Sequence, residues 1–405
     1  MSREEIFEQC VQEIAKTNCI MLEAATGVGK TSISIRLVNH LMSNSYLVNH
    51  TGPVNILILV AKRVHKQTWK DEIEKWGGFH HPNEDYLTNI NVCMECYESL
   101  KNHCKEHWDV ILGDEIHHIA SETRLGFLKT MSFCFFIGLS ATIPMKLKQY
   151  FKYKYHAGVV SCDIIEAIED EVLPEPTILL FPLQVENSRV SEVLELHPKA
   201  SGPVIECEYK DLKRYKFKNV HIKCKCTQAQ KLLELDNMIR WFKDKAFSNP
   251  RLKQTWLYFC GKRLEFLADC KMQWVKLILH KLKDERTITF CKTIAQTEEL
   301  GKNCIHSQNK DATKVYEDFN KKKIDHITAV NILNENANLV DCRYGVFCNI
   351  TSSDIITRQR QGRLLRHKDP IMVIPYYKGT REEELVLKGI EGFKSVKTIH
   401  SISEI

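Results

Sequence analysis

The sequence predicts an α/β protein with open, mostly parallel sheets, and three observations support this prediction. Short apolar segments typical of strands alternate with segments whose apolar residues recur at helical spacing. The apolar segment 19–22 is followed by a glycine-rich loop and then by a helical pattern. The length of 405 residues exceeds one ordinary core and therefore predicts two or three domains.

The bulk composition indicates a soluble globular chain, with 43% hydrophobic and 27% charged residues. Its formal net charge is only +6, so contacts with nucleic acid would have to come from local basic patches. No signal peptide follows Met1, and no apolar run reaches the roughly 18 residues that span a membrane. We therefore expect an intracellular, cytoplasmic protein without membrane contacts, while the sequence indicates no oligomeric state.

The sixteen cysteines are scattered through apolar segments, which favours reduced thiols over a disulfide framework. One group has the residue types and spacing of zinc ligands: Cys93, Cys96, His103, Cys104 and His107. The alternative, which we prefer, is a set of buried thiols beside a solvated histidine face.

Residues 22–32 have the pattern of a phosphate-binding loop. Gly27 and Gly29 allow backbone N–H groups to surround phosphate oxygens, Lys30 reaches the terminal phosphates, and the Thr31 hydroxyl suits Mg²⁺. Ala24 stands where the pattern expects its first glycine, and the alternative is an ordinary strand-to-helix turn. The residues expected to bind the nucleotide are Ala25, Thr26, Gly27, Val28, Gly29, Lys30, Thr31 and Ser32.

The other elements of the first half follow the same alternation. Residues 3–17 and about 66–76 have helical patterns, and residues 33–41 extend the helix that follows the loop. Residues 54–60 form a continuous apolar run, as expected for a strand covered on both faces. Further strands are predicted at residues 90–92, 110–112 and 133–139.

Two carboxylates follow the strand at 110–112. Asp114 and Glu115 would lie at the carboxyl edge of the sheet, where open α/β sheets bind their ligands. Asp114 is suited to hold Mg²⁺, and Glu115 to orient a water molecule for attack. The alternative is an acidic turn that merely ends the strand.

Three motifs in this half resemble those of the superfamily 2 helicases. Residues 114–117 resemble their Asp-Glu-x-His box, and residues 140–142 resemble their Ser-Ala-Thr motif. Residues 60–63, with Gln67 and Trp69, resemble motif Ia, whose loop touches the nucleic-acid backbone in the family.

Two motifs in the second half extend the resemblance. Residues 333–339 resemble motif V, with Asn336 where the family usually has glycine, and residues 359–366 match motif VI, Gln-x-x-Gly-Arg-x-x-Arg. Arg363 and Arg366 are three residues apart, so both guanidinium groups would lie on one face of a helix and point at a γ-phosphate. The alternative is a basic surface helix.

The segment between these halves is less regular. Residues 170–176 hold two prolines and predict an extended linker, so we divide the chain into domains 1–172 and 173–405. Residues 188–283 would form a largely helical insertion in the second domain. Within it, the basic, aromatic run 209–218 suits nucleic acid or, alternatively, a solvated hairpin or loop. We expect most of the rings of Trp241, Trp256 and Trp274 to lie in a core.

The resemblance implies two tandem RecA-like domains that bind ATP and Mg²⁺ between them and move along nucleic acid. The residues implied for catalysis are Glu115, Arg366, Arg363 and Gln359, and those for metal binding are Thr31 and Asp114. Those implied for coupling hydrolysis to movement are His117, Ser140, Ala141 and Thr142. The residues expected to contact nucleic acid are Lys62, Arg63, Lys213 and Arg214.

The compact chain favours a phage-type or repair-type DNA helicase that acts on single-stranded, forked or branched DNA. One alternative is a DExH-type RNA helicase, because the Asp-Glu-x-His box occurs in both. The other is a nucleic-acid-binding ATP clamp or sensor that does not unwind. Gln9 and Gln12 are candidates for reading the adenine base.

Overall fold

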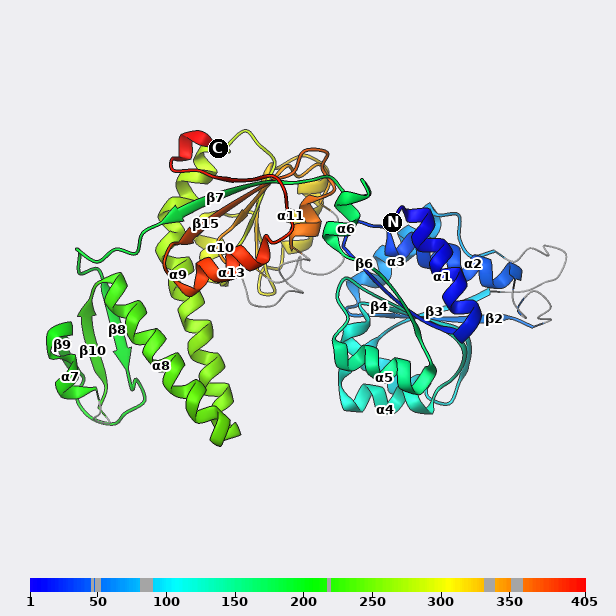
Figure 1. Ribbon diagram of the computed structural model, residues 1–405, viewed down its shortest axis with the longest axis horizontal. Coiled ribbons are helices and arrows are strands. Elements are labelled where there is room, and N and C mark those ends of the chain that lie inside the picture. The colour runs from blue at the N-terminus through cyan, green and yellow to red at the C-terminus, as the bar shows by residue number, and fades with distance from the viewer. Residues whose placement is uncertain (45–46, 48–51, 81–89, 217–219, 331–338, 351–359) are drawn as a thin grey trace.

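A computed structural model of the 405-residue chain describes residues 1–44, 47, 52–80, 90–216, 220–330, 339–350 and 360–405. It contains two parallel-sheet bodies and a third, smaller body that projects from the second (Figure 1). None of the helices in these residues combines the length and apolar character needed to cross a membrane.

The first body is a six-stranded parallel sheet in the order β3-β2-β4-β5-β1-β6. Its strands are β1 (Cys19–Ala24), β2 (Val54–Val60), β3 (Ile90–Cys96), β4 (His107–Asp114), β5 (Ser132–Ser140) and β6 (Gly158–Cys162). The α-helices are α1 (Arg3–Thr17), α2 (Lys30–Asn44), α3 (Val64–Lys75), α4 (Glu122–Thr130), α5 (Met145–Tyr155) and α6 (Ile164–Glu169). The 3₁₀ segments are η2 (Tyr97–His103) and η3 (Ile116–Ala120).

The apolar strands of this sheet are covered on both faces. Six of the seven residues of β2 are buried, since helices pack above and below it. The predicted strands 90–92 and 110–112 each extend further, because pairing with the neighbouring strands continues through their less apolar ends as β3 and β4. Sequence patterning finds the apolar centre of a strand more readily than such ends.

The second body is a seven-stranded sheet in the order β12-β13-β11-β14-β15-β7-β16, again with parallel neighbours. Its strands are β7 (Thr177–Leu183), β11 (Thr287–Phe290), β12 (Cys304–Ile305), β13 (His326–Ala329), β14 (Tyr344–Phe347), β15 (Ile371–Tyr377) and β16 (Val396–Thr398). The helical elements beside it include α10 (Ile294–Leu300), α11 (Ala312–Asn320), α13 (Arg381–Gly389) and η7 (Ile402–Glu404). Residues 170–176 connect the two sheets, while the exact boundary at 172 stays a prediction.

The insertion contains a small sheet as well as helices. Strands β8 (Glu192–Leu196), β10 (Ile222–Cys226) and β9 (Ile205–Glu208) pair in that order. The helical elements are η4 (Tyr209–Asp211), α7 (Leu212–Tyr215), α8 (Gln228–Ser248), η5 (Pro250–Leu252) and α9 (Lys253–Lys281). The sheet is hard to recognise from the polar pattern before residue 220, because only one of its faces packs on a core.

The long hairpin of α8 and α9 is anchored at one end only. Near its C-terminus, α9 packs on the second sheet, and the buried Lys271 pairs with Glu382 and donates to the Pro375 carbonyl at 3.2 Å. The other end projects away from the sheet (Figure 1). Of the three tryptophans expected mostly in a core, Trp274 is partly buried against the core of the second body, while Trp241 is 54% exposed and does not fit the expectation.

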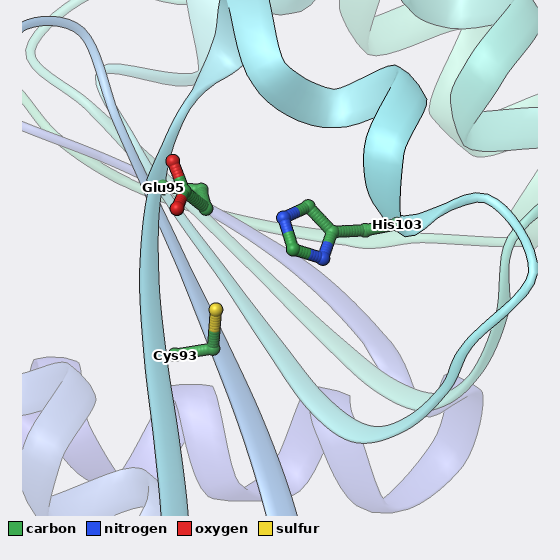
Figure 2. Close-up of side chains that lie close together, drawn as sticks. All are labelled: Cys93, Glu95 and His103. Carbon is green, nitrogen blue, oxygen red and sulfur yellow. The ribbon is translucent and has the colours of Figure 1, made fainter.

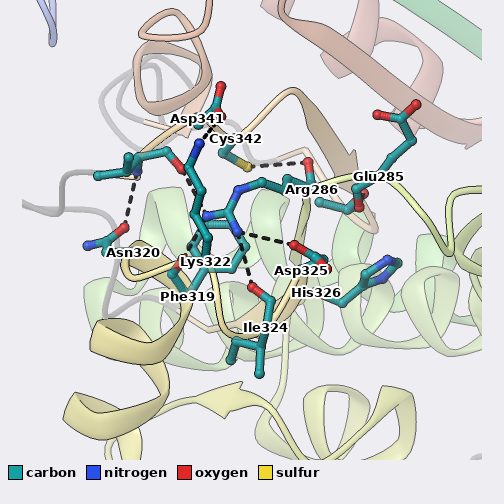
Figure 3. A network of polar contacts seen from close by, with 12 residues as sticks. Glu285, Arg286, Phe319, Asn320, Lys322, Ile324, Asp325, His326, Asp341 and Cys342 are labelled. Carbon is teal, nitrogen blue, oxygen red and sulfur yellow. Dashed lines mark hydrogen bonds and ion pairs between the residues drawn. The ribbon is translucent and has the colours of Figure 1, made fainter.

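Arg286 lies directly before β11, and its side chain forms hydrogen bonds to three other segments of the second body (Figure 3). Its guanidinium donates to the carbonyls of Phe319, Ile324 and Val340 at 2.7, 3.2 and 3.0 Å. It also pairs with Asp325 at 3.2 Å and lies 4.2 Å from the centre of the Phe319 ring. One side chain therefore fixes the end of α11 and the approaches to β13 and β14.

Replacing Arg286 with alanine is expected to destabilise the second body by about 2–4 kcal/mol, because three carbonyls lose a charged donor. Urea denaturation followed by circular dichroism measures this change. Lys322→Ala is the matched control, since its ion pair with Asp341 is exposed to solvent and should contribute less than about 1 kcal/mol. Equal stability of the Arg286 variant and the wild type would contradict the prediction.

Candidate nucleotide-binding site

The site forms where three neighbouring strands of the first sheet end. Strands β4, β5 and β1 are adjacent, and their register places Asp114 beside Leu139 and Glu23 beside Ser140. Because the strands are parallel, the segments that follow them meet at one edge. The phosphate-binding loop, the acidic pair and the Ser-Ala-Thr segment are brought together in this way.

The loop after β1 has the backbone shape of a phosphate cradle. Gly27 and Gly29 have φ of +99° and +103°, values that residues with a side chain rarely adopt. Helix α2 begins directly afterwards at Lys30. The Lys30 ammonium donates to the Ala24 carbonyl at 2.9 Å. Burial lowers the pKa of Lys30, and the carboxylates of Glu115 and Asp114 oppose that shift.

Asp114 is held in place from two sides. The indole N–H of the buried Trp69 donates to its carboxylate at 2.9 Å, and the Tyr97 hydroxyl donates to its backbone carbonyl at 2.8 Å. Asp114 is 4% exposed, so these bonds replace water. Trp69, which the sequence places in a nucleic-acid-binding motif, supports the acidic pair instead.

Glu115 adopts a left-handed backbone conformation, with φ of 49° and ψ of 56°, and is 2% exposed. Such a conformation is unfavourable for a residue with a side chain and is typical of functional sites. Its carboxylate lies 3.0 Å from the Ser140 hydroxyl and 3.4 Å from Nδ1 of His117. Burial raises the pKa of Glu115, but the His117 hydrogen bond and the charges of Lys30 and Arg363 hold it below its ordinary value.

The Ser-Ala-Thr segment connects Glu115 to the neighbouring strand. The Ser140 hydroxyl contacts His117 Nδ1 and the Thr142 carbonyl, each at 3.0 Å. The next residue, Ile143, donates its N–H to Glu23 on β1 at 2.7 Å. Sequence reasoning did not single out Glu23, although a carboxylate inside an otherwise apolar strand is an available signal.

The second body reaches this edge through the residues of motif VI. Residues 360–364 are helical, and Gly362 packs directly on the phosphate-binding loop. A Cβ built at Gly362 would lie 2.8 Å from Thr26 Cβ and 3.0 Å from the Thr26 carbonyl oxygen, so only glycine fits. Burial and the neighbouring Arg366 lower the pKa of Arg363 to about 10, and burial also lowers the pKa of Arg366. Both remain cations at neutral pH.

A cavity of about 920 Å³ lies between the two bodies. Its walls include Lys30 and Thr31 of the loop, Asp114 and Glu115 of the acidic pair, and Arg363 and Arg366. Thr26, Gly27, Gly29 and Ser32 also line it. The cations and the glycine cradle fit a nucleotide triphosphate, and the oxygens of Thr31 and Asp114 are the ligand type that Mg²⁺ prefers.

Several predicted residues take no part in the cavity wall. Ala25 and Val28 are buried in the core beneath the loop, while Gln9 and Gln12 lie outside the wall on α1. Arg3, from the same helix, does line the cavity, and its guanidinium lies 3.4 Å from the Gly27 carbonyl. Gln359 and residues 333–338 of motif V lie outside the described residues.

The residues predicted to contact nucleic acid lie elsewhere. Lys62 and Arg63 are exposed in the loop between β2 and α3. Lys213 and Arg214 are exposed on α7, which lies beside the small sheet on the far side of the second body (Figure 1). The cavity therefore brings together only the residues predicted to bind or hydrolyse the nucleotide.

The possible zinc ligands are only partly brought together. Cys93 and Glu95 on β3 face His103 at the end of η2, with their ligand atoms within 4.8 Å of one another (Figure 2). Cys96 and Cys104 are not in this group, and His107 belongs to a second one with Asp109 and Cys134. Glu95 already pairs with Lys66 at 3.1 Å, and His103 with Glu106 at 2.8 Å. Two of the three ligand side chains in this group thus already have partners in the protein.

Comparison with known proteins agrees with this geometry. Residues 2–145 match the family described as "Type III restriction enzyme, res subunit", and residues 270–368 match the "Helicase conserved C-terminal domain". Together the matches span more than half of the chain. No curated protein sequence is significantly similar to it.

Solved structures show the same fold. Saccharomyces cerevisiae Dbp5 bound to RNA and ADP BeF3 is 10% identical with a TM-score of 0.55, covering 98% of this chain and 89% of Dbp5. The ATP-dependent Type ISP restriction-modification enzyme LlaBIII bound to DNA is 13% identical with a TM-score of 0.56, covering 99% of this chain and 31% of LlaBIII. The two parallel-sheet bodies are thus tandem RecA-like domains. The chain belongs to the superfamily 2 helicases, which are ATP-hydrolysing enzymes.

Proposed function

We propose that this chain hydrolyses ATP in the cavity between its RecA-like domains and uses the resulting domain movement to travel along DNA. The observation that carries the proposal is the composition of the cavity wall. The first domain contributes Lys30, Thr31, Asp114 and Glu115, and the second contributes arginines 363 and 366. Because both domains supply charged groups, the site is complete only while the domains are close together.

In the proposed reaction, a water molecule attacks the γ-phosphorus, and the bond from this phosphorus to the bridging oxygen of ADP breaks. Glu115 orients the water and accepts its proton, since the lowered pKa keeps the carboxylate ionised at neutral pH. Lys30, Arg363 and Arg366 stabilise the negative charge on the phosphate oxygens. Bound Mg²⁺ would neutralise further phosphate charge, with Thr31 and Asp114 as its ligands.

The same contacts offer a route from hydrolysis to movement. His117 and Ser140 touch the Glu115 carboxylate, and the segment through Ala141 and Thr142 continues directly from β5. Loss of the γ-phosphate removes the group that attracts both arginines, which favours opening of the cavity. We assign the coupling role to His117, Ser140, Ala141 and Thr142.

DNA is the proposed track, with single-stranded, forked or branched DNA as the substrate. The support comes from the N-terminal match to a restriction-enzyme subunit and from the fold shared with LlaBIII, which was solved bound to DNA. An RNA helicase is the alternative, favoured by the comparably similar fold of Dbp5, which was solved bound to RNA.

We expect single-stranded or forked DNA to stimulate ATP hydrolysis more than the matching RNA. Glu115→Gln should lower kcat by at least about 100-fold while ATP still binds, because it removes the proton acceptor and little volume. Steady-state phosphate release and equilibrium ATP binding measure the two effects.

Glu98→Gln, at an exposed glutamate of η2, is the control and should leave hydrolysis unchanged. Stronger stimulation by RNA would favour the RNA helicase. ATP turnover that no nucleic acid stimulates would contradict movement along a strand. ATP binding without turnover in the wild type would favour the clamp.

Gly362→Ala should separate the domains where Gly362 packs on Thr26. The added methyl group would collide with Thr26, so we expect kcat to fall by at least about tenfold and thermal stability to change little. Gly126→Ala on α4 is the matched control, because an added Cβ there meets no atom within 4 Å. Wild-type turnover by Gly362→Ala would show that this contact is not needed for the reaction.

A further inference from the structure

The positive charge of the chain is concentrated at the free end of the α8–α9 hairpin. Residues 238–263 contain seven basic residues and one acidic residue, a formal net charge of +6. The whole chain also carries +6, so the other 379 residues sum to zero. The basic residues of the hairpin end are Arg240, Lys243, Lys245, Arg251, Lys253, Lys262 and Arg263.

Two half-exposed aromatic rings lie on one side of this hairpin. Phe242 of α8 and Phe259 of α9 stack between the helices, with ring centres 5.1 Å apart and planes at 15°. In an antiparallel helix pair, the residues that precede two facing residues project to the same side. These are Trp241 and Tyr258, which are 54% and 56% exposed.

Each of these rings has a lysine beside it. The Lys245 ammonium lies 5.9 Å from the Trp241 ring centre, and the Lys262 ammonium lies 6.0 Å from that of Tyr258. Both lysines are one helical turn beyond their ring. The result is a face of two rings and two cations, which we call the Trp241–Tyr258 face.

The basic run at 209–216 differs from this hairpin end because most of its cations already pair with carboxylates of the protein. Lys210 pairs with Glu208 at 2.7 Å, Arg214 pairs with Asp211 at 3.2 Å, and Lys216 pairs with the buried Glu234. Carboxylates of the protein thus already neutralise most of that run.

At the hairpin end, two cations have carboxylate partners: Lys262 pairs with Glu265 at 3.0 Å and Arg263 with Asp236 at 2.8 Å. In the part of the chain that the structure describes, the other five basic residues have no carboxylate within ion-pair distance. Their charge is available to an external anion.

We propose that the Trp241–Tyr258 face binds single-stranded nucleic acid, as a contact separate from the nucleotide cavity. Unpaired bases stack on the two rings, and the surrounding lysines and arginines bind the phosphates. A duplex would not use the rings in this way, because its bases already stack on one another. The hairpin projects from the second RecA-like domain, so a strand held here would move with that domain (Figure 1).

The test measures binding of fluorescent single strands of DNA and RNA, about 20 nucleotides long, and of duplex DNA, to the full-length chain. Trp241→Leu with Tyr258→Leu removes both rings and keeps the charge. We expect this variant to bind single strands at least about tenfold more weakly, with duplex affinity within about twofold of wild type. Comparing the affinities for the DNA and RNA single strands shows which of the two the face binds more tightly.

A second variant, Lys243→Glu with Lys245→Glu, should flatten the dependence of single-strand affinity on salt, since each lost phosphate contact lowers the slope by about 0.7. Lys276→Glu with Lys321→Glu makes the same charge change at two lysines that already pair with Glu299 and Glu317, and this paired-lysine variant should leave the slope unchanged.

ATP hydrolysis without nucleic acid should be unchanged in all three variants, which shows that the ATP site remains folded. Wild-type affinity in both hairpin variants, an equal loss for duplex DNA in the ring variant, or an equal loss in the paired-lysine variant would overturn the proposal. The proposal takes only its class of partner from the proposed function. If nucleic acid does not stimulate hydrolysis but the ring variant still loses single-strand binding, the proposed movement along nucleic acid is contradicted. The proposed binding by the Trp241–Tyr258 face is then still supported.

Discussion

The contact between Gly362 and Thr26 is the constraint that brings motif VI to the cavity between the domains. It places the helical residues of motif VI against the phosphate-binding loop with no room for a side chain. Arg363 and Arg366, next to this contact in the chain, then face the edge of the first sheet. Because Gly362 leaves no space for a side chain at this contact, the backbone of motif VI lies directly against the loop, and both arginines line the cavity beside it.

The acidic pair illustrates how the first domain keeps buried carboxylates in one position. Asp114 is fixed by Trp69 and Tyr97, which are buried and approach from elements that follow neighbouring strands. Glu115 is fixed by His117 and Ser140. Such partners offset the cost of removing the carboxylates from water and leave their charge directed at the cavity.

The sequence was sufficient to predict the two large sheets, and also the phosphate-binding loop and the acidic pair, because each of these follows an apolar strand within a few residues. The two arginines of the cavity wall were predicted from the spacing of motif VI instead. The sequence was insufficient for Trp69, whose bond to Asp114 depends on how α3 packs, and for Gly362, whose role appears only when the two domains meet. The small sheet at β8–β10 was also missed, since its strands are short and interrupt their apolar residues with glutamates and lysines. Likewise, the basic run at 209–216 looks available in the sequence, but its carboxylate partners include Glu234, from another element.

The proposed mechanism requires that an arginine of the second domain completes an ATP site built by the first. Single-turnover ATP hydrolysis by Arg366→Lys is the decisive measurement, because lysine keeps the charge but loses the planar guanidinium. We expect the rate to fall by at least about 100-fold while the Kd for ATP stays within about threefold of wild type. A hydrolysis rate within about threefold of wild type would show that Arg366 is not the completing group.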